Sequence, residues 1–248
     1  MNTGKKLRLN RLFGGDGRLF IVAIDHATFG QVKGLETIKP LVQSIIEGGT
    51  DGFIANPGTI TQVLADLQGV SVIMNIPYAP SMVRFAAKLG VDAIKTSYFG
   101  NPNIPEDYII KISRIAAEAN EWGIPYILEL DPVDDLGKTL YDIEALKLIC
   151  KAGSELGADI IKASYAGPAE RYREIVDACE VPIIIRGGEK MSSTADFLDI
   201  IADSIKAGAI GAAIGRNIWQ ERNPKLISSI VWKLIHGKLS KNAALKLL

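Results

Sequence analysis

The feature that most constrains the fold is the alternation of short apolar runs with longer amphipathic segments along the 248 residues of the chain. Runs that are apolar on both faces are typical of strands buried beneath helices. Strands that alternate with helices build a parallel sheet, so the fold class is α/β. The eight runs lie at residues 19–25, 52–55, 70–75, 92–97, 126–131, 159–164, 182–186 and 210–215.

The segments between the runs have the period of helices. Residues 106–122 place Tyr108, Ile112 and Ile115 at spacings of three and four, and residues 142–157 end in a glycine stop. Eight strand–helix units fit a single closed (β/α)8 barrel, also called a TIM barrel. An open doubly wound sheet is the alternative, but it would carry a GxGxxG turn after the first strand, where this chain reads IDHATFG. With no proline-rich linker, we expect one domain over residues 1–248.

Composition excludes several classes of function. Lys plus Arg and Asp plus Glu are both 28, so the formal net charge is zero and a nucleic-acid partner is not expected. Cys150 and Cys179 have the pattern of small buried residues. Because His26 and His236 are the only histidines, we expect no zinc or iron site, and no cofactor. No apolar stretch is long enough for a signal peptide or a membrane span, which predicts a cytoplasmic protein that does not contact membranes.

Polar residues stand late in several of the apolar runs. In a barrel, chemistry takes place at the carboxyl ends of the strands, and side chains two residues apart on a strand point the same way. This rule brings together a set of candidates from four strands: Asp25, His26, Lys95, Glu129, Asp131, Lys162 and Ser164.

Lys95 and Lys162 are the candidate nucleophiles. Burial lowers the pKa of a lysine, and a partly neutral amine attacks a carbonyl to give an imine. A second nearby cation lowers the pKa of the first further. The alternative is that either lysine only pairs with a neighbouring carboxylate. Glu129, Asp131 and Asp25 are candidate proton carriers, and we expect at least one of these three to be structural.

The last two strands end in residues suited to an anion. Gly187 and Gly188 allow backbone N–H groups to approach a phosphate closely. Gly215 and Arg216 precede a segment predicted to be one helix up to residue 235, whose N-terminus favours negative charge. Barrel enzymes often bind phosphate with these two loops. His26 and Ser164 are candidate substrate-binding residues, although a lone histidine after a strand is as often structural.

Residues 158–220 carry three linked motifs, IK-x-x-Y, then VP and an apolar run with GG-x-K, then IGRN. In these motifs the chain resembles the DhnA-type, or archaeal-type, class I fructose-bisphosphate aldolases; residues 23–30 and 48–58 are weaker matches. The resemblance implies that Lys162 is the Schiff-base lysine, that Asp25 faces the substrate, and that the glycine loops with Arg216 hold a substrate phosphate. The chain departs from the family where many members carry Tyr-Pro, since it has Asp131-Pro132, while Glu129 is similar to the strand-five Glu of tagatose-bisphosphate-type class I aldolases.

The resemblance therefore implies a metal-independent class I aldolase, a lyase that cleaves or forms a phosphorylated ketose such as fructose 1,6-bisphosphate. Two alternatives stay open. One is a transaldolase, synthase or thiolase-type transfer that uses the same lysine, and the other is a non-catalytic barrel that binds a sugar phosphate. Barrels of this kind often assemble, so we expect a homo-oligomer.

Overall fold

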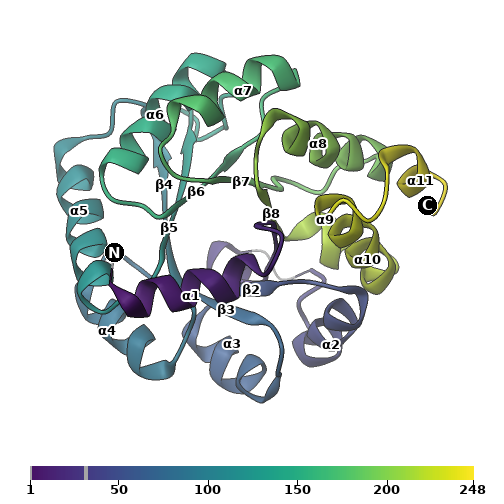
Figure 1. Ribbon diagram of the computed structural model, residues 1–248, viewed down its shortest axis with the longest axis horizontal. Coiled ribbons are helices and arrows are strands. Elements are labelled where there is room, and N and C mark those ends of the chain that lie inside the picture. The colour runs from purple at the N-terminus through teal and green to yellow at the C-terminus, as the bar shows by residue number, and fades with distance from the viewer. Residues whose placement is uncertain (1, 31–32) are drawn as a thin grey trace.

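The computed structural model describes residues 2–30 and 33–248, and in these residues eight parallel strands close into a barrel (Figure 1). Strand β1 pairs with both β2 and β8, which confirms the predicted (β/α)8 barrel and excludes the open sheet. The strands are β1 (Leu19–Ala23), β2 (Gly52–Ala55), β3 (Ser71–Asn75), β4 (Ala93–Gly100), β5 (Tyr126–Pro132), β6 (Ile160–Ser164), β7 (Ile183–Arg186) and β8 (Gly211–Ile214).

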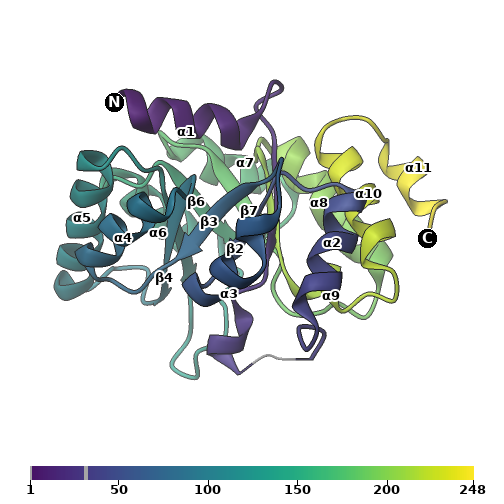
Figure 2. The ribbon, with the colours of Figure 1, turned by 90° about the horizontal axis from the view of Figure 1, so that it is seen from below.

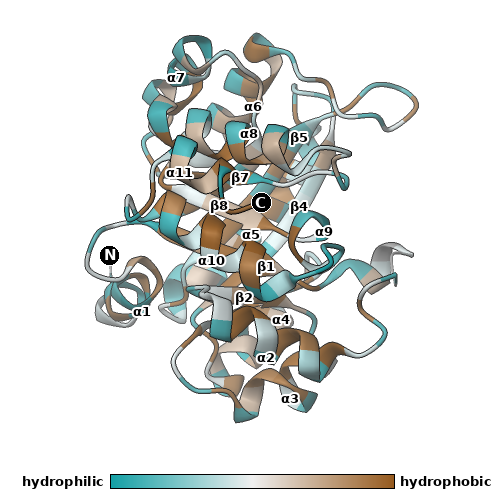
Figure 3. Ribbon diagram, turned by 90° about the vertical axis from the view of Figure 1, so that its right-hand side faces the viewer, coloured by the Kyte–Doolittle hydropathy of each residue, from teal (hydrophilic) through white to brown (hydrophobic). Residues whose placement is uncertain are grey.

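Helices surround the strands, and most pack one apolar face against them, whereas α11 packs on α8 and α10. In Figure 3, strand β1 is brown and the helices around it carry both colours, as helices with one buried face should. The helices are α1 (Thr3–Phe13), α2 (Ile38–Gly48), α3 (Pro57–Gln62), α4 (Pro80–Leu89), α5 (Glu106–Glu121), α6 (Ile143–Glu155), α7 (Ala169–Ala178), α8 (Thr194–Ala207), α9 (Arg216–Trp219), α10 (Pro224–Ile235) and α11 (Lys241–Leu245), with single turns η1 (His26–Phe29) and η2 (Leu64–Asp66).

The prediction of one helix between Gly215 and residue 235 was wrong, because the segment is divided into α9 and α10. The side chain of Asn223 accepts a hydrogen bond from the backbone N–H of Leu226, and Pro224 occupies the first turn of α10. An asparagine cap followed by proline starts a new helix, since proline has no N–H to continue the preceding one.

The inside of the barrel is apolar at its amino end. Alternate residues of the strands point inward there and form one buried cluster, which Leu12 of α1 joins. Figure 2 shows α1 lying across this end, on the opposite side of the barrel from η1. Two positions after the last inward apolar residue, seven of the strands have a polar residue and β8 has Gly215, so the inward polar side chains lie at the carboxyl end. The inward apolar residues of the strands are Leu19, Ile21, Ala23, Ile54, Ile73, Ala93, Ile127, Ile160, Ile184 and Ala213.

An aspartate precedes each of three alternate strands, and its carboxylate forms a hydrogen bond with the start of the strand before. Asp51, Asp92 and Asp159 stand immediately before β2, β4 and β6. Each carboxylate accepts a hydrogen bond from the backbone of the preceding strand's start, at Phe20 (2.6 Å), Val72 (3.0 Å) and Tyr126 (2.8 Å). These bonds satisfy backbone N–H groups at the amino end of the barrel.

Cations from outside the barrel meet the same aspartates. From α1, Lys5 lies 3.0 Å from Asp159, and Arg11 lies 2.7 Å from Asp92. His236, just after α10, has Nε2 3.0 Å from Asp51 and Nδ1 2.6 Å from Oδ2 of Asp16. The helix that covers the amino end is thus attached by ion pairs as well as by its apolar side chains.

Cys150 is buried in α6 as expected, whereas Cys179, at the end of α7, is only half-buried. Among the described helices, none combines the length and the apolar character that crossing a bilayer requires.

Candidate active site

Three charged side chains from neighbouring strands meet inside the carboxyl end of the barrel. The carboxylate of Glu129 (β5) lies between two lysines, with Oε1 2.7 Å from Nζ of Lys162 (β6) and Oε2 2.8 Å from Nζ of Lys95 (β4). All three are at least 95% buried. The strand register pairs Glu129 directly with Lys162, so both side chains point inward at the same level.

Lys95 lies between two carboxylates. Its Nζ is 3.1 Å from Oδ2 of Asp25, and it also donates to Oγ of Ser97 at 2.9 Å. Burial alone lowers the pKa of Lys95, but the charges of Glu129 and Asp25 outweigh burial and raise the pKa above its ordinary value. Lys95 therefore stays protonated.

The effects of burial and of neighbouring charges on the pKa add up differently for Lys162. Burial lowers its pKa most, Glu129 raises it, and Lys95 lowers it again, so the pKa ends below the ordinary value. Burial raises the pKa of Glu129, but Lys162, Lys95 and Arg186 together hold it well below its usual range. The pKa values of the two candidate lysines are thus shifted in opposite directions, and Lys162 is the one that loses its proton more easily.

Asp131 is fully buried and fully engaged. It accepts hydrogen bonds from the backbone N–H and the hydroxyl of Ser164, at 2.9 and 2.8 Å, and forms an ion pair with Arg186. Arg186 in turn lies over the ring of Phe99, 4.8 Å from its centroid, and 3.8 Å from Oε1 of Glu129. Asp131 and Phe99 therefore orient a guanidinium group beside the Glu129–Lys162 pair.

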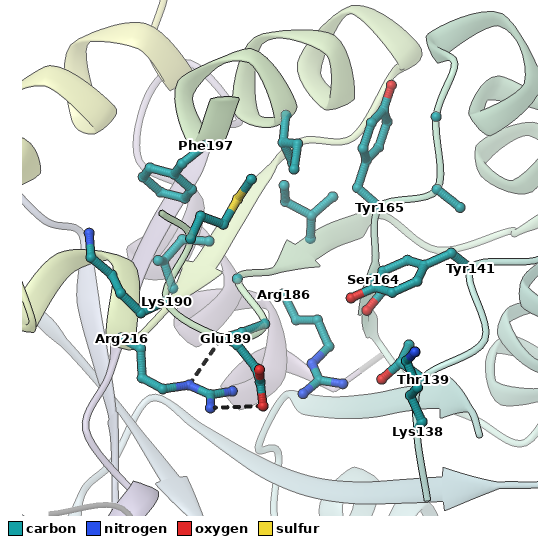
Figure 4. A pocket seen from close by; sticks show the side chains of 18 of the residues that line it. Lys138, Thr139, Tyr141, Ser164, Tyr165, Arg186, Glu189, Lys190, Phe197 and Arg216 are labelled. Carbon is teal, nitrogen blue, oxygen red and sulfur yellow. Dashed lines mark hydrogen bonds and ion pairs between the residues drawn. The ribbon is translucent and has the colours of Figure 1, made fainter. Parts of the chain in front are cut away.

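A pocket of about 920 Å³ opens next to this cluster, over the ends of β6, β7 and β8 (Figure 4). Ser164, Arg186, Gly187, Gly188 and Arg216 all line it. In Figure 4, Arg186 lies between Ser164 on one side and Arg216 with Glu189 on the other. The structure thus brings Ser164 and the predicted phosphate residues Gly187, Gly188 and Arg216 to one cavity, whereas Lys162 and Gly215 are not among the residues that line it.

The loop after β7 is fixed to the start of α9. Arg216 donates from Nε to the carbonyl of Gly188 at 3.1 Å. Asn217, which is buried, donates to the carbonyls of Gly187 and Glu189 and accepts from the backbone N–H of Met191. Sequence reasoning did not select Asn217, although it follows the selected Arg216 directly.

His26 packs against the glycine that ends β8. A Cβ atom on Gly215 would lie 2.5 Å from Cε1 of His26, so this position requires glycine. The imidazole makes an edge contact with Trp219 at 5.4 Å, and burial lowers its pKa to about 4. His26 is therefore a neutral group at the mouth, with Nδ1 3.4 Å from Oδ1 of Asp25.

Two inward asparagines complete the ring of polar groups, and sequence reasoning missed both. Asn56 follows β2 and donates from Nδ2 to the backbone carbonyl of Asp25 at 3.1 Å. Asn75 ends β3 and donates from Nδ2 to Oδ1 of Asn56 at 3.0 Å. The signal was available, because they stand two positions after the inward Ile54 and Ile73.

Metal-ligand clustering is not a feature of this site: no group of three or more His, Cys, Asp and Glu side chains suited to a metal ion occurs in residues 2–30 and 33–248. The polar groups that could act on a substrate here are amines, carboxylates, amides, guanidinium groups, the hydroxyl of Ser164 and the imidazole of His26.

A family model described as DeoC/LacD family aldolase matches residues 19–221. The chain belongs to this family. Among curated relatives of this DeoC/LacD aldolase, an uncharacterized aldolase of Saccharolobus solfataricus is 31% identical, with 99% of each chain covered. A 2-amino-3,7-dideoxy-D-threo-hept-6-ulosonate synthase of Halobacterium salinarum is 27% identical, covering 98% of this chain and 96% of the relative.

The fold of the DeoC/LacD aldolase is also that of an archaeal fructose-1,6-bisphosphate aldolase solved with its catalytic Lys covalently bound to the carbinolamine intermediate of the substrate. The TM-score is 0.81 at 23% identity, over 94% of this chain and 100% of that chain. The predicted resemblance to the archaeal aldolases and the expectation of an aldolase are confirmed. The relatives differ in their reactions, so the family alone does not identify a substrate.

Proposed function

We propose that this aldolase works through a Schiff base between Lys162 and the carbonyl of a phosphorylated ketose, such as fructose 1,6-bisphosphate or a related sugar phosphate. One observation carries the proposal: Lys162 is an inward-facing amine with a lowered pKa, 2.7 Å from an ionised carboxylate and beside a cationic pocket. A buried neutral amine that has a proton carrier within reach is what imine formation requires.

In the proposed mechanism, neutral Nζ of Lys162 adds to the ketone carbon. Glu129 passes the proton released by the amine to the alkoxide oxygen, which gives the carbinolamine. A second proton, taken from solvent and delivered by Glu129, lets the carbinolamine hydroxyl leave as water and yields the protonated imine. The protonated imine then withdraws electrons, and the neighbouring carbon–carbon bond breaks as a base removes the proton of the hydroxyl that becomes the aldehyde. The remaining enamine is protonated on carbon, and water hydrolyses the imine to release the second product and free Lys162.

We assign the base to Asp25 and a positioning role to Asp131. In the described part of the chain, Oδ1 of Asp25 accepts no hydrogen bond, whereas both oxygens of Asp131 are engaged by Ser164 and Arg186. Lys95 keeps the charge next to Lys162 positive and so favours its neutral form.

The substrate phosphate is assigned to the loops after β7 and β8. Gly187 and Gly188 line the pocket without side chains that would cover their backbone, and Arg216 supplies a guanidinium group in the same pocket. Gly215, the other glycine predicted to contact phosphate, is buried against His26. Ser164 and His26 would lie between these loops and the lysine.

Borohydride trapping tests the proposal. The protein is incubated with dihydroxyacetone phosphate, fructose 1,6-bisphosphate or other ketose phosphates, reduced, digested and examined by mass spectrometry. We expect a reduced adduct on the peptide that contains Lys162, its loss in Lys162→Met, and its retention in Lys138→Met, which removes an exposed lysine of the pocket wall. An adduct on another lysine, or none with any phosphate tested, would refute the proposal.

A second candidate is transfer to an acceptor by the same lysine, as in a transaldolase or synthase. The similarity to the Halobacterium salinarum synthase over 96% of that protein favours this alternative. Release of free aldehyde from a ketose phosphate alone supports the aldolase, whereas turnover only in the presence of a second carbonyl compound supports the transfer.

A further inference from the structure

The mouth of the barrel is divided by charge. The pocket over β6, β7 and β8 has guanidinium groups from Arg186 and Arg216, whereas β2 and β3 contribute the neutral amides Asn56 and Asn75. We propose that this amide pair is a second substrate subsite, which binds an uncharged, hydroxyl-bearing end of the carbon chain. The inference rests on the proposed role of Lys162 and narrows the substrate class to monophosphates whose other end is a neutral polyol.

The two asparagines belong to the same polar layer as the reacting groups. The register pairs Asn75 with Lys95, and Asn56 holds the backbone carbonyl of Asp25. Both asparagine side chains are partly exposed, while Lys95 and Asp25 are buried. A molecule in the mouth can therefore touch the amides directly.

The amides retain groups for a ligand. Each NH2 has two protons, and each donates one of them, Asn75 to Asn56 and Asn56 to Asp25. Within residues 2–30 and 33–248, Oδ1 of Asn75 accepts no hydrogen bond. The pair thus offers two N–H donors and a free oxygen, which match a hydroxyl group because a hydroxyl both donates and accepts.

The charge of this side does not suit a second phosphate. Phosphate groups in proteins are bound best by Arg and Lys through charge-assisted hydrogen bonds. The segments that follow β2 and β3 read Asn-Pro-Gly-Thr from residue 56 and Ile-Pro-Tyr-Ala-Pro-Ser from residue 76, without either residue type. The charges nearest the amides, the Asp25 carboxylate and the Lys95 ammonium, form an ion pair at 3.1 Å and so do not add an unpaired cation for a phosphate.

The position also agrees with the order of the reaction. Asp25, the proposed base, contacts both groups: its carboxylate pairs with Lys95, and its backbone carbonyl accepts a hydrogen bond from Asn56. The carbon that carries the hydroxyl deprotonated by Asp25 becomes the aldehyde carbon, so the carbon chain beyond it extends toward Asn56 and Asn75.

The test compares aldehyde acceptors in the condensation direction, with dihydroxyacetone phosphate as the donor. Three acceptors are compared. Glyceraldehyde is neutral and carries hydroxyl groups, glyceraldehyde 3-phosphate is anionic, and propionaldehyde has no hydroxyl group. We expect kcat/KM for glyceraldehyde to equal or exceed that for glyceraldehyde 3-phosphate, and to exceed that for propionaldehyde by about three- to tenfold for each hydrogen bond. A tenfold preference for the phosphorylated aldehyde would overturn the inference.

Asn75→Ala and Asn75→Ser should lower kcat/KM for glyceraldehyde by about three- to tenfold, and leave propionaldehyde and borohydride trapping of the donor within about twofold. Asn242→Ala, the same truncation on exposed α11, is the matched control, and thermal unfolding checks that each variant is folded. Equal losses of kcat/KM for all acceptors would refute a binding role for the amides. The proposed function would still stand in that case, provided that the donor adduct on Lys162 is trapped. If wild type gives no adduct, the proposed function fails and the inference fails with it.

Discussion

His236 joins two segments that are far apart in the sequence, and its replacement by glutamine should weaken the amino end of the barrel in a pH-dependent way. Its ring nitrogens lie 2.6 Å from Asp16, in the turn before β1, and 3.0 Å from Asp51, before β2. The ring also stacks on Trp232, with centroids 4.4 Å apart. The histidine side chain is 7% exposed, so both contacts are sheltered on its side.

The expected loss follows from the exposure of the two carboxylates. A hydrogen bond between charged groups contributes about 1.5–3 kcal/mol. The Asp16 side chain is 44% exposed, so solvent screening reduces the contribution of its ion pair with His236 to about 0–1 kcal/mol. The Asp51 side chain is 21% exposed, so its pair with His236 is screened less. Allowing for one bond that glutamine keeps, we expect His236→Gln to lower the free energy of unfolding by about 2 kcal/mol, or Tm by about 4–8 °C.

The sign of the pH dependence is determined by the pKa of His236. Burial lowers it, but the hydrogen bonds and charges of Asp51 and Asp16 outweigh burial and raise it above the ordinary value of about 6.5. A raised pKa in the folded state stabilises the fold fully below the unfolded value, and this contribution is lost as pH rises through the folded pKa. The difference between wild type and variant should therefore be largest near pH 6 and decrease toward pH 9.

Urea unfolding at several pH values measures this difference, with Lys238→Gln as the control for an exposed charge on the same segment. A difference between wild type and His236→Gln that is constant with pH, or that grows as pH rises, would refute the assignment of a charged His236.

Three further predictions concern the active site. Lys95→Met removes the cation that lowers the pKa of Lys162, so the rise of kcat/KM with pH should move to higher pH, measured as a pH–rate profile; an unchanged profile would contradict the coupling. Arg216→Met should raise KM for a phosphorylated substrate about tenfold or more, yet leave imine trapping of an unphosphorylated ketone unchanged, and equal effects on both would exclude a phosphate contact. Asp131→Asn leaves Arg186 without its buried partner and should lower the free energy of unfolding by about 3 kcal/mol, with a loss below about 1 kcal/mol counting against the ion pair.

Much of the fold followed from the sequence because a strand buried on both faces has an apolar pattern of its own. Each predicted run overlaps its strand, and the largest extension is β4, which continues to Gly100 through pairing with β5. The break between α9 and α10 was missed because the apolar period continues across it, although Asn223-Pro224 is a local start signal. Helix α1 was not predicted either, because it covers the amino end of the barrel, a surface that forms only when the eight strands close.

The positions of the site residues could be predicted to the extent that the strand period shows which side chains point into the barrel. Strand period placed Lys95, Glu129 and Lys162 together, and the structure brings them into contact. It did not distinguish the two lysines, because their protonation depends on how many carboxylates surround each one in space. Among the described residues, Lys95 pairs with both Glu129 and Asp25, whereas Lys162 pairs with Glu129 alone.

The helix that seals the amino end has a practical consequence for handling the enzyme. Helix α1 starts at Thr3 on the face opposite to the mouth (Figure 2). A protein anchored to a solid support through a short N-terminal extension would therefore present its catalytic opening to the solution, and immobilised preparations should keep full access for substrates.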